Sequence, residues 1–219
     1  MILAIIQARM SSTRLPGKVL MPIGGKPILQ WVIDAAEQAK LVDETIVATS
    51  TKPEDAVIVD HCFNVSQNYC SLGPLEDVLG RFYEAALAFG PLHIVRLTAD
   101  CPMLALYPEV IDETIRLHLR ENNQYTTNSG FDGSFLDGLD VEVFTMEALT
   151  RAAKLAELPQ QREHVTPFMH RFSIEERGRL YCIAPSDKKY SVDTREDYER
   201  VKEEMEKCLH ARKNYLTVL

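Results

Sequence analysis

The chain has 219 residues, of which 46% are hydrophobic and 26% are charged, as in ordinary globular proteins. This length is enough for one well-buried α/β domain and marginal for two. A formal net charge of −8 argues against binding of nucleic acid through a broad basic face and against a polybasic membrane-binding surface. Any anion that the chain binds must therefore be held by a local cluster of cations.

Short β-branched runs alternate with amphipathic helical patterns over the first 122 residues. The sequence predicts strands at 3–6, 44–50, 63–65 and 93–98. It predicts helices at 26–40, 54–62, 76–89 and 107–122. This alternation is typical of a mostly parallel sheet with helices on both faces.

The regular alternation of predicted strands and helices changes from about residue 124 onward. The sequence there predicts strands at 125–130, 139–144 and 180–184. It predicts helices at 145–157, 163–171 and 194–212. We expect these elements to add mixed or antiparallel strands to the same sheet and to form a lid over one end of it, within a single domain.

The cysteines and the apolar runs indicate the cellular compartment of the protein. The five cysteines form no CxxC pair, which predicts reduced thiols rather than a disulfide framework or a zinc site. No basic segment precedes the first apolar run, and no run reaches the roughly 18 residues of a spanning helix. We expect a cytoplasmic protein with no nucleic-acid or membrane partner.

Three cations follow the first predicted strand, in the segment "QARMSSTRLPGKVL": Arg9, Arg14 and Lys18. In open α/β sheets ligands bind beyond the carboxyl ends of the strands, and cations with free backbone N–H groups suit a polyphosphate. The alternative is a solvated turn with incidental charge. Neither GxxxxGK[ST] nor GxGxxG is present, which argues against a P-loop kinase and a dinucleotide dehydrogenase.

Two aspartates stand where strands are predicted to end. Asp100 follows the strand at 93–98 and is either a Mg²⁺ ligand or a cap of the next turn. Asp193 precedes Thr194 and Asp197, which have the spacing of a capping box. Because the capping box accounts for the latter two, Asp193 is free to act as a second carboxylate.

Two further polar clusters give weaker signals. Asp140 and Glu142 are two residues apart and so share one face of a strand; they bind sugar hydroxyls or a cation, or they form the exposed face of an edge strand. Arg162, Glu163 and His164 occupy a predicted helix start, where the histidine has either a substrate role or a structural one.

These motifs resemble those of the cytidylyltransferases that activate acidic sugars. "QARMSSTRLPGKVL" is similar to the N-terminal motif of that family, "TADCPML" to its strand-end segment and "VDTREDYERV" to its closing segment. The three occur in the family's order across nearly the whole chain. "GPLEDVLGRFYEAA", "LDGLDVEVF" and "REHVTPF" are similar in particular to the spore coat polysaccharide biosynthesis protein F group, homologues of CMP-Kdo synthetase.

The resemblance implies a Rossmann-like, glycosyltransferase-A-type nucleotidyltransferase fold and a homodimer. It implies a Mg²⁺-dependent reaction of CTP with a sugar, of the acidic class, to give a CMP-sugar and pyrophosphate for surface polysaccharide biosynthesis. Residues 1–122 would form the nucleotide-binding half, and residues 123–219 the sugar-binding and possible dimerisation half.

The resemblance and the polar clusters described above together give the expected site residues. The expected nucleotide-binding residues are Gln7, Ala8, Arg9, Ser11, Ser12, Arg14, Lys18 and Thr98. The expected catalytic residues are Arg14, Lys18 and Asp100, and the expected metal ligands are Asp100 and Asp193. The expected sugar-binding residues are Asp140, Glu142, Arg162 and His164.

Two alternatives stay open. A glycosyltransferase would use a nucleotide-sugar donor on a related fold, but such enzymes usually carry Asp-x-Asp where this chain has Asp100-Cys101-Pro102. A non-catalytic nucleotide-binding paralogue in polysaccharide assembly could lose the metal ligands, whereas both Asp100 and Asp193 are present. The identity of the sugar is open as well.

Overall fold

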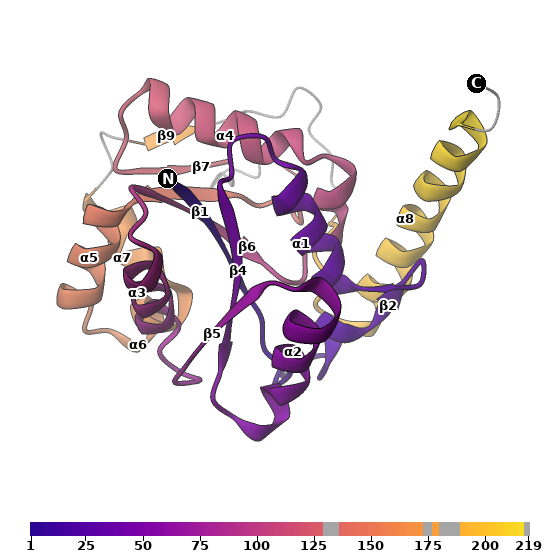
Figure 1. The fold of residues 1–219 in the computed structure, drawn as a ribbon, viewed down its shortest axis with the longest axis horizontal. Helices are drawn as coiled ribbons and strands as arrows, with labels where there is room; N and C mark the ends of the chain where they lie inside the picture. Colours follow the sequence, from indigo (N-terminus) through magenta and orange to yellow (C-terminus); the bar gives the residue numbers. More distant parts are fainter. Residues whose placement is uncertain (129–135, 173–176, 180–188, 217–219) are drawn as a thin grey trace.

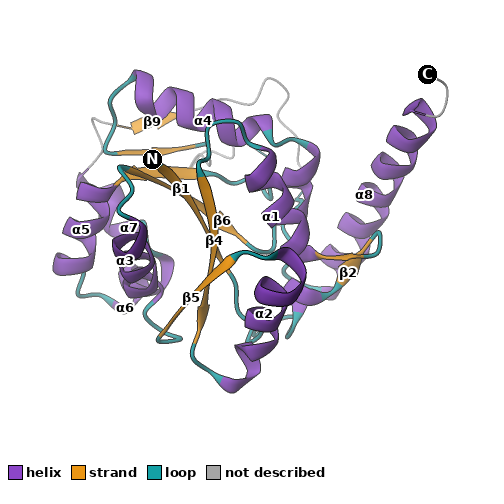
Figure 2. Cartoon of the chain, in the orientation of Figure 1, coloured by secondary structure: helices purple, strands orange, loops and turns teal. Residues whose placement is uncertain are grey.

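A seven-stranded sheet crosses the middle of the protein (Figures 1 and 2). The computed structural model describes residues 1–128, 136–172, 177–179 and 189–216. The strands of the sheet are β1 (Ile2–Gln7), β4 (Glu44–Ser50), β5 (Tyr69–Gly73), β6 (His93–Thr98), β7 (Tyr125–Thr127), β8 (Glu142–Thr145) and β9 (Arg177–Arg179). Two short strands, β2 (Pro22–Ile23) and β3 (Lys26–Pro27), pair separately as a hairpin.

The sheet is mixed and mostly parallel, as the sequence predicts. Its strand order is β5-β4-β1-β6-β8-β7-β9, and β8 runs antiparallel to both of its neighbours. Because β8 is reversed, its first residue, Glu142, lies near the carboxyl end of β6, in register with Arg96. The carboxyl ends of β1 and β6 also meet here, since Gln7 is in register with Thr98.

Helices cover both faces of the sheet. They are α1 (Ile28–Gln38), α2 (Ala56–His61), α3 (Val78–Phe89), α4 (Glu109–Arg120), α5 (Met146–Leu155), α6 (Pro159–His164), α7 (Pro167–Phe172) and α8 (Arg195–Leu216). Alternate residues of β1 explain the two layers: Ala4 and Ile6 pack with α1, α4 and the start of α8, whereas Leu3 and Ile5 pack with α3, α5 and α7. Full burial of each large aliphatic side chain contributes about 1.5–3 kcal/mol.

Two of the predicted elements are wrong. The predicted strand at 63–65 lies within a π-helical turn, Cys62–Ser66, and the edge strand is instead β5. Phe63 and Val65 are 80% and 65% exposed, so their apolar character does not reflect burial in the sheet. The predicted helix at 163–171 is divided into α6 and α7 by Val165, whose φ of 68° interrupts the helix.

The predicted strand at 180–184 lies outside the described residues. No helix in the described part of the chain is long and apolar enough to cross a membrane. Four of the cysteines, Cys62, Cys70, Cys101 and Cys208, are free thiols, as predicted.

Candidate active site

The loop after β1 is held in a fixed shape by its own backbone and by one buried carboxylate. The N–H groups of Ser12 and Gly17 both donate to the carbonyl oxygen of Met10, at 2.9 and 2.8 Å. Gly17 has a φ of +74°, a conformation that glycine adopts without a steric cost. Asp55, which is fully buried, accepts a hydrogen bond from the N–H of Met10 at 2.6 Å. The loop is therefore anchored before any ligand binds.

Lys18 follows this loop and joins three distant segments. Its ammonium group donates to Asp100 Oδ2 at 2.6 Å, to the carbonyl oxygen of Val192 at 2.6 Å and to Asp193 Oδ1 at 3.1 Å. Arg14 forms a second ion pair with Asp193, at 2.8 Å. Lys18 is only 8% exposed, so its charge is compensated almost entirely by these oxygens.

The start of α8 positions Asp193, as the sequence predicts. The N–H of Asp197 donates to Thr194 Oγ1 at 3.2 Å, and the N–H of Thr194 donates to Asp197 Oδ2 at 3.1 Å, which completes the capping box. The N–H of Val192 donates to the carbonyl oxygen of Asp100 at 2.9 Å. These bonds place the two predicted metal ligands side by side.

Asp193 is kept ionised by its surroundings. Partial burial by itself would raise the pKa of its carboxyl group, but hydrogen bonds from Lys189 and Lys18 outweigh this and lower the pKa. The segment that carries Asp193 lies on the turn at Gly138, where a Cβ atom would come within 2.3 Å of the backbone of residues 190–191. Only glycine fits at that position.

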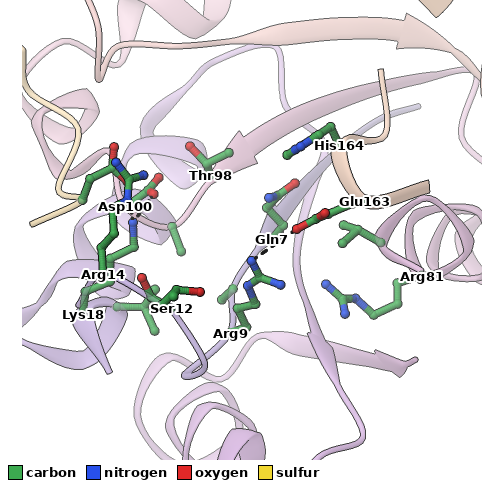
Figure 3. A pocket seen from close by; sticks show the side chains of 16 residues that line it. Gln7, Arg9, Ser12, Arg14, Lys18, Arg81, Thr98, Asp100, Glu163 and His164 are labelled. Carbon is green, nitrogen blue, oxygen red and sulfur yellow. Dashed lines mark hydrogen bonds and ion pairs between the residues drawn. The ribbon is translucent and has the colours of Figure 1, made fainter. Parts of the chain in front are cut away.

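A cavity of about 310 Å³ opens over the carboxyl ends of β1 and β6 (Figure 3). Most of the predicted nucleotide-binding and metal-binding residues line it. From the predicted set, the lining includes Gln7, Ala8, Arg9, Ser12, Arg14, Lys18, Thr98, Asp100, His164 and Asp193. The structure therefore brings these predicted residues together around one cavity.

The structure adds a buried cation, Arg81, that no sequence motif indicated. Arg81 of α3 lines the same cavity and is 2% exposed. Its Nη1 donates to two backbone carbonyls of the loop before α3, at 2.8 and 3.0 Å, while its Nε is buried with no partner among the described residues. Burial lowers the pKa of Arg81; Asp55 opposes this shift and Arg9 adds to it. Arg9 also pairs with Glu163 at 3.6 Å.

Four predicted residues do not line this cavity. The Ser11 hydroxyl is buried with no partner in the described region. Asp140 accepts a backbone N–H within its own turn at 2.9 Å. Arg162 forms two hydrogen bonds with Asp77, at 2.9 and 2.6 Å, and Glu142 is surrounded by protein donors. Of the four predicted sugar-binding residues, the geometry supports a cavity position for His164 alone.

The donor set of the cavity fits a magnesium ion held together with a phosphorylated ligand. Asp100 and Asp193 direct carboxylate oxygens toward the same point, which the Lys18 ammonium group contacts. Mg²⁺ commonly binds one or two carboxylates and completes its shell with phosphate oxygens and water. The described residues contain no cluster of three or more potential metal ligands, so a cation here would complete its shell with oxygens from a ligand or from water.

Comparisons with known proteins identify the family of this chain. The cytidylyltransferase family model matches residues 3–217. The chain is 34% identical to the spore coat polysaccharide biosynthesis protein SpsF of Bacillus subtilis, over 92% of this chain and 85% of that protein.

Solved structures show the same fold. A cytidylyltransferase of Leptospira borgpetersenii serovar Hardjo-bovis superposes with a TM-score of 0.79 at 29% identity, over 92% of this chain and 84% of that one. CMP:2-keto-3-deoxy-manno-octonic acid synthetase complexed with CTP superposes with a TM-score of 0.69 at 19% identity, over 94% of this chain and 98% of that one. The loop, the cavity and the family model lead to one conclusion: this chain belongs to the cytidylyltransferase family and is a nucleotidyltransferase.

Proposed function

We propose that the chain transfers CMP from CTP to a sugar of the acidic class, releases pyrophosphate and requires Mg²⁺. The observation that carries the proposal is the position of Lys18. This buried cation contacts both candidate metal ligands, Asp100 and Asp193, at the end of a cavity that is also lined by Arg9 and Arg14. Such a group of charges suits a triphosphate together with a divalent cation.

The ion pairs of the free protein provide the groups that the reaction needs. In the proposed complex, Lys18 and Arg14 release the carboxylates and turn to the α-phosphate and the pyrophosphate. Asp100 and Asp193 would hold Mg²⁺, which when bound polarises phosphate oxygens and the attacking hydroxyl. Charges thus exchange partners, and none is left buried without a counter-ion.

The chemical step is an in-line displacement at phosphorus. A hydroxyl oxygen of the acceptor bonds to the α-phosphorus and its proton passes to solvent, while the bond from that phosphorus to the bridging oxygen of the departing pyrophosphate breaks. The chain's contribution is to hold the reactants in line and to neutralise the charge that develops on the leaving group. Lys18 and Arg14 carry this second role, and Arg9 fixes the rest of the triphosphate.

The biological setting and assembly belong to the same proposal. The similarity to a protein named for spore coat polysaccharide biosynthesis supports a role in surface polysaccharide synthesis. Family resemblance supports a homodimer and a cytoplasmic location. We propose no single sugar, because His164 is the one predicted sugar-binding residue that lines the cavity.

A pair of substitutions tests the assignment. Lys18→Ala and Asp100→Asn should each reduce the rate of pyrophosphate release from CTP with an acidic sugar by roughly a hundredfold or more. Lys26→Ala is the matched control, because Lys26 pairs with Asp34 on the surface and does not line the cavity. Unchanged turnover in both cavity variants would contradict the roles proposed for Lys18 and Asp100.

Nucleotide preference separates the proposal from its alternatives. Thermal shift in the presence of Mg²⁺ is measured with CTP, UTP, ATP and GTP. Stabilisation by CTP that requires Mg²⁺ supports cytidylyl transfer. A shift with a nucleotide-sugar alone would instead support a glycosyltransferase, and CTP binding without turnover would support a non-catalytic paralogue.

A further inference from the structure

Glu142 carries a buried carboxylate at the start of β8, and it accepts hydrogen bonds from β7 and from the turn between α6 and α7. Its Oε1 accepts from the Tyr125 hydroxyl at 2.6 Å and from Thr166 Oγ1 at 2.8 Å, and its Oε2 pairs with Arg96. His170 lies 3.7 Å from Oε1. Burial alone would raise the pKa of Glu142, but Arg96 and these donors lower it to about 2. The carboxyl group of Glu142 is therefore ionised at neutral pH.

The first branch of this network leads to the floor of the cavity. Arg96 Nε donates to Gln7 Oε1 at 3.0 Å. Because an arginine Nε can only donate, the carboxamide of Gln7 has one orientation, with its oxygen on Arg96. Gln7 lines the cavity, and its NH₂ group is left as the donor on that side. The ion pair with Glu142 holds Arg96 in the position that this requires.

The second branch leads to the wall of the cavity. The N–H of Thr166 donates to the carbonyl oxygen of His164 at 2.8 Å, around Val165 with φ 68° and ψ −60°. This is a γ-turn with positive φ, which is rare and strained, and more so at a buried β-branched residue. Such a conformation persists only where the surroundings enforce it. The bond from Thr166 to Glu142 supplies one restraint directly beside His164, which lines the cavity.

We infer that Glu142 is a positioning residue that fixes the Gln7 carboxamide through Arg96 and the His164 turn through Thr166. It does not contact the ligand itself. This replaces the expectation that Glu142 binds the sugar, since its oxygens are taken by protein donors. The inference deepens the proposed function and rests on it only where turnover of CTP is the readout.

The primary test needs no ligand. Resonances of the Gln7 side-chain NH₂ group and of the His164 imidazole are recorded by NMR in the wild type and in Glu142→Gln, and are assigned from their loss in Gln7→Ala and His164→Ala. Both sets should shift in Glu142→Gln. The control is Asp112→Asn, which alters another buried carboxylate that accepts two backbone N–H groups at the start of the loop after α1; it should leave both sets in place.

A milder variant separates the two branches and guards against a misfolded Glu142→Gln. Thr166→Val removes one hydroxyl and leaves the pair between Glu142 and Arg96. It should shift the His164 resonances and leave the Gln7 resonances unchanged. If both sets respond equally, or neither does, the two-branch arrangement is wrong.

Turnover gives an independent readout. Pyrophosphate release should fall about tenfold to a hundredfold in Glu142→Gln and by much less in Asp112→Asn at matched loss of thermal stability. In a Gln7→Ala background, Glu142→Gln should reduce the rate of pyrophosphate release by a smaller factor than it does alone, because both changes act on the Gln7 carboxamide. Additive effects would overturn the inference. If the wild type releases no pyrophosphate, the proposed function fails, while the NMR comparison still decides the role of Glu142.

Discussion

Replacement of Lys18 by methionine tests the charge arrangement of the cavity through stability alone. The substitution keeps the length of the side chain and removes a cation that contacts Asp100 at 2.6 Å and Asp193 at 3.1 Å. Two carboxylates are then left close together and mostly buried. Breaking such a pair from one side costs about 3–5 kcal/mol. We expect about 3 kcal/mol, because Arg14 and Lys189 still contact Asp193.

A divalent cation should recover part of this loss. Once the ammonium group is gone, Mg²⁺ can bind between the carboxylates, and at ten times its Kd it would stabilise the variant by about 1.4 kcal/mol. The assay is urea unfolding with MgCl₂ or with EDTA, and Lys26→Met is the surface control. Equal stability of the Lys18 and Lys26 variants would show that Lys18 does not neutralise the two carboxylates. An equal gain from Mg²⁺ in the wild type and in the Lys18 variant would show the same.

Three further predictions concern stability and nucleotide affinity. Burial, and then the charge of His93, lower the pKa of His118 from 6.5 to about 4, so the unfolded chain binds more protons than the folded one between these pH values. The free energy of unfolding should therefore fall by up to about 3 kcal/mol as the pH drops through that window. His118→Gln should flatten this pH dependence, measured by urea unfolding at several pH values. Gly138→Ala should lower the free energy of unfolding by about 2 kcal/mol, through strain at positive φ. It should also weaken the Mg²⁺-dependent stabilisation by CTP. Wild-type values of both quantities would contradict the close packing of Gly138 against residues 190–191. Asp55→Asn weakens the charged hydrogen bond to Met10 that anchors the loop after β1, at a cost of about 2 kcal/mol, and should raise the KM for CTP more than it lowers kcat. An unchanged KM would show that nucleotide binding does not depend on this anchor.

The parts of the fold that could be predicted from sequence are those governed by local patterns. The boundaries of β4 and β6 match the prediction, because both are buried β-branched runs that end at polar residues. The capping box at Thr194 and Asp197 was also predicted from a local pattern, the spacing of its two residues. Lys18 and Asp100 each follow a predicted strand, and the carboxyl ends of parallel strands meet on one side of a sheet. The sequence therefore predicted that these two residues lie on the same side.

The parts that could not be predicted depend on contacts between distant residues. Arg81 has the sequence setting of an ordinary surface arginine on an amphipathic helix, and only its packing against the loop before α3 buries it. Glu142 looked like a ligand on a strand face, but Arg96 of the neighbouring strand neutralises it. The strained turn at Val165 contains neither glycine nor asparagine, so no local signal marked the break between α6 and α7.

Cytidylyl transfer itself is tested most directly by following the α-phosphate of CTP. The purified protein is incubated with Mg²⁺, α-³²P-labelled CTP and a panel of acidic sugars, and the products are separated and weighed by mass spectrometry. For at least one sugar we expect a labelled CMP-sugar formed in equal amount to pyrophosphate, and loss of both products in Lys18→Ala. Label found only in CMP or CDP, or transfer that occurs only from a nucleotide-sugar donor, would contradict it.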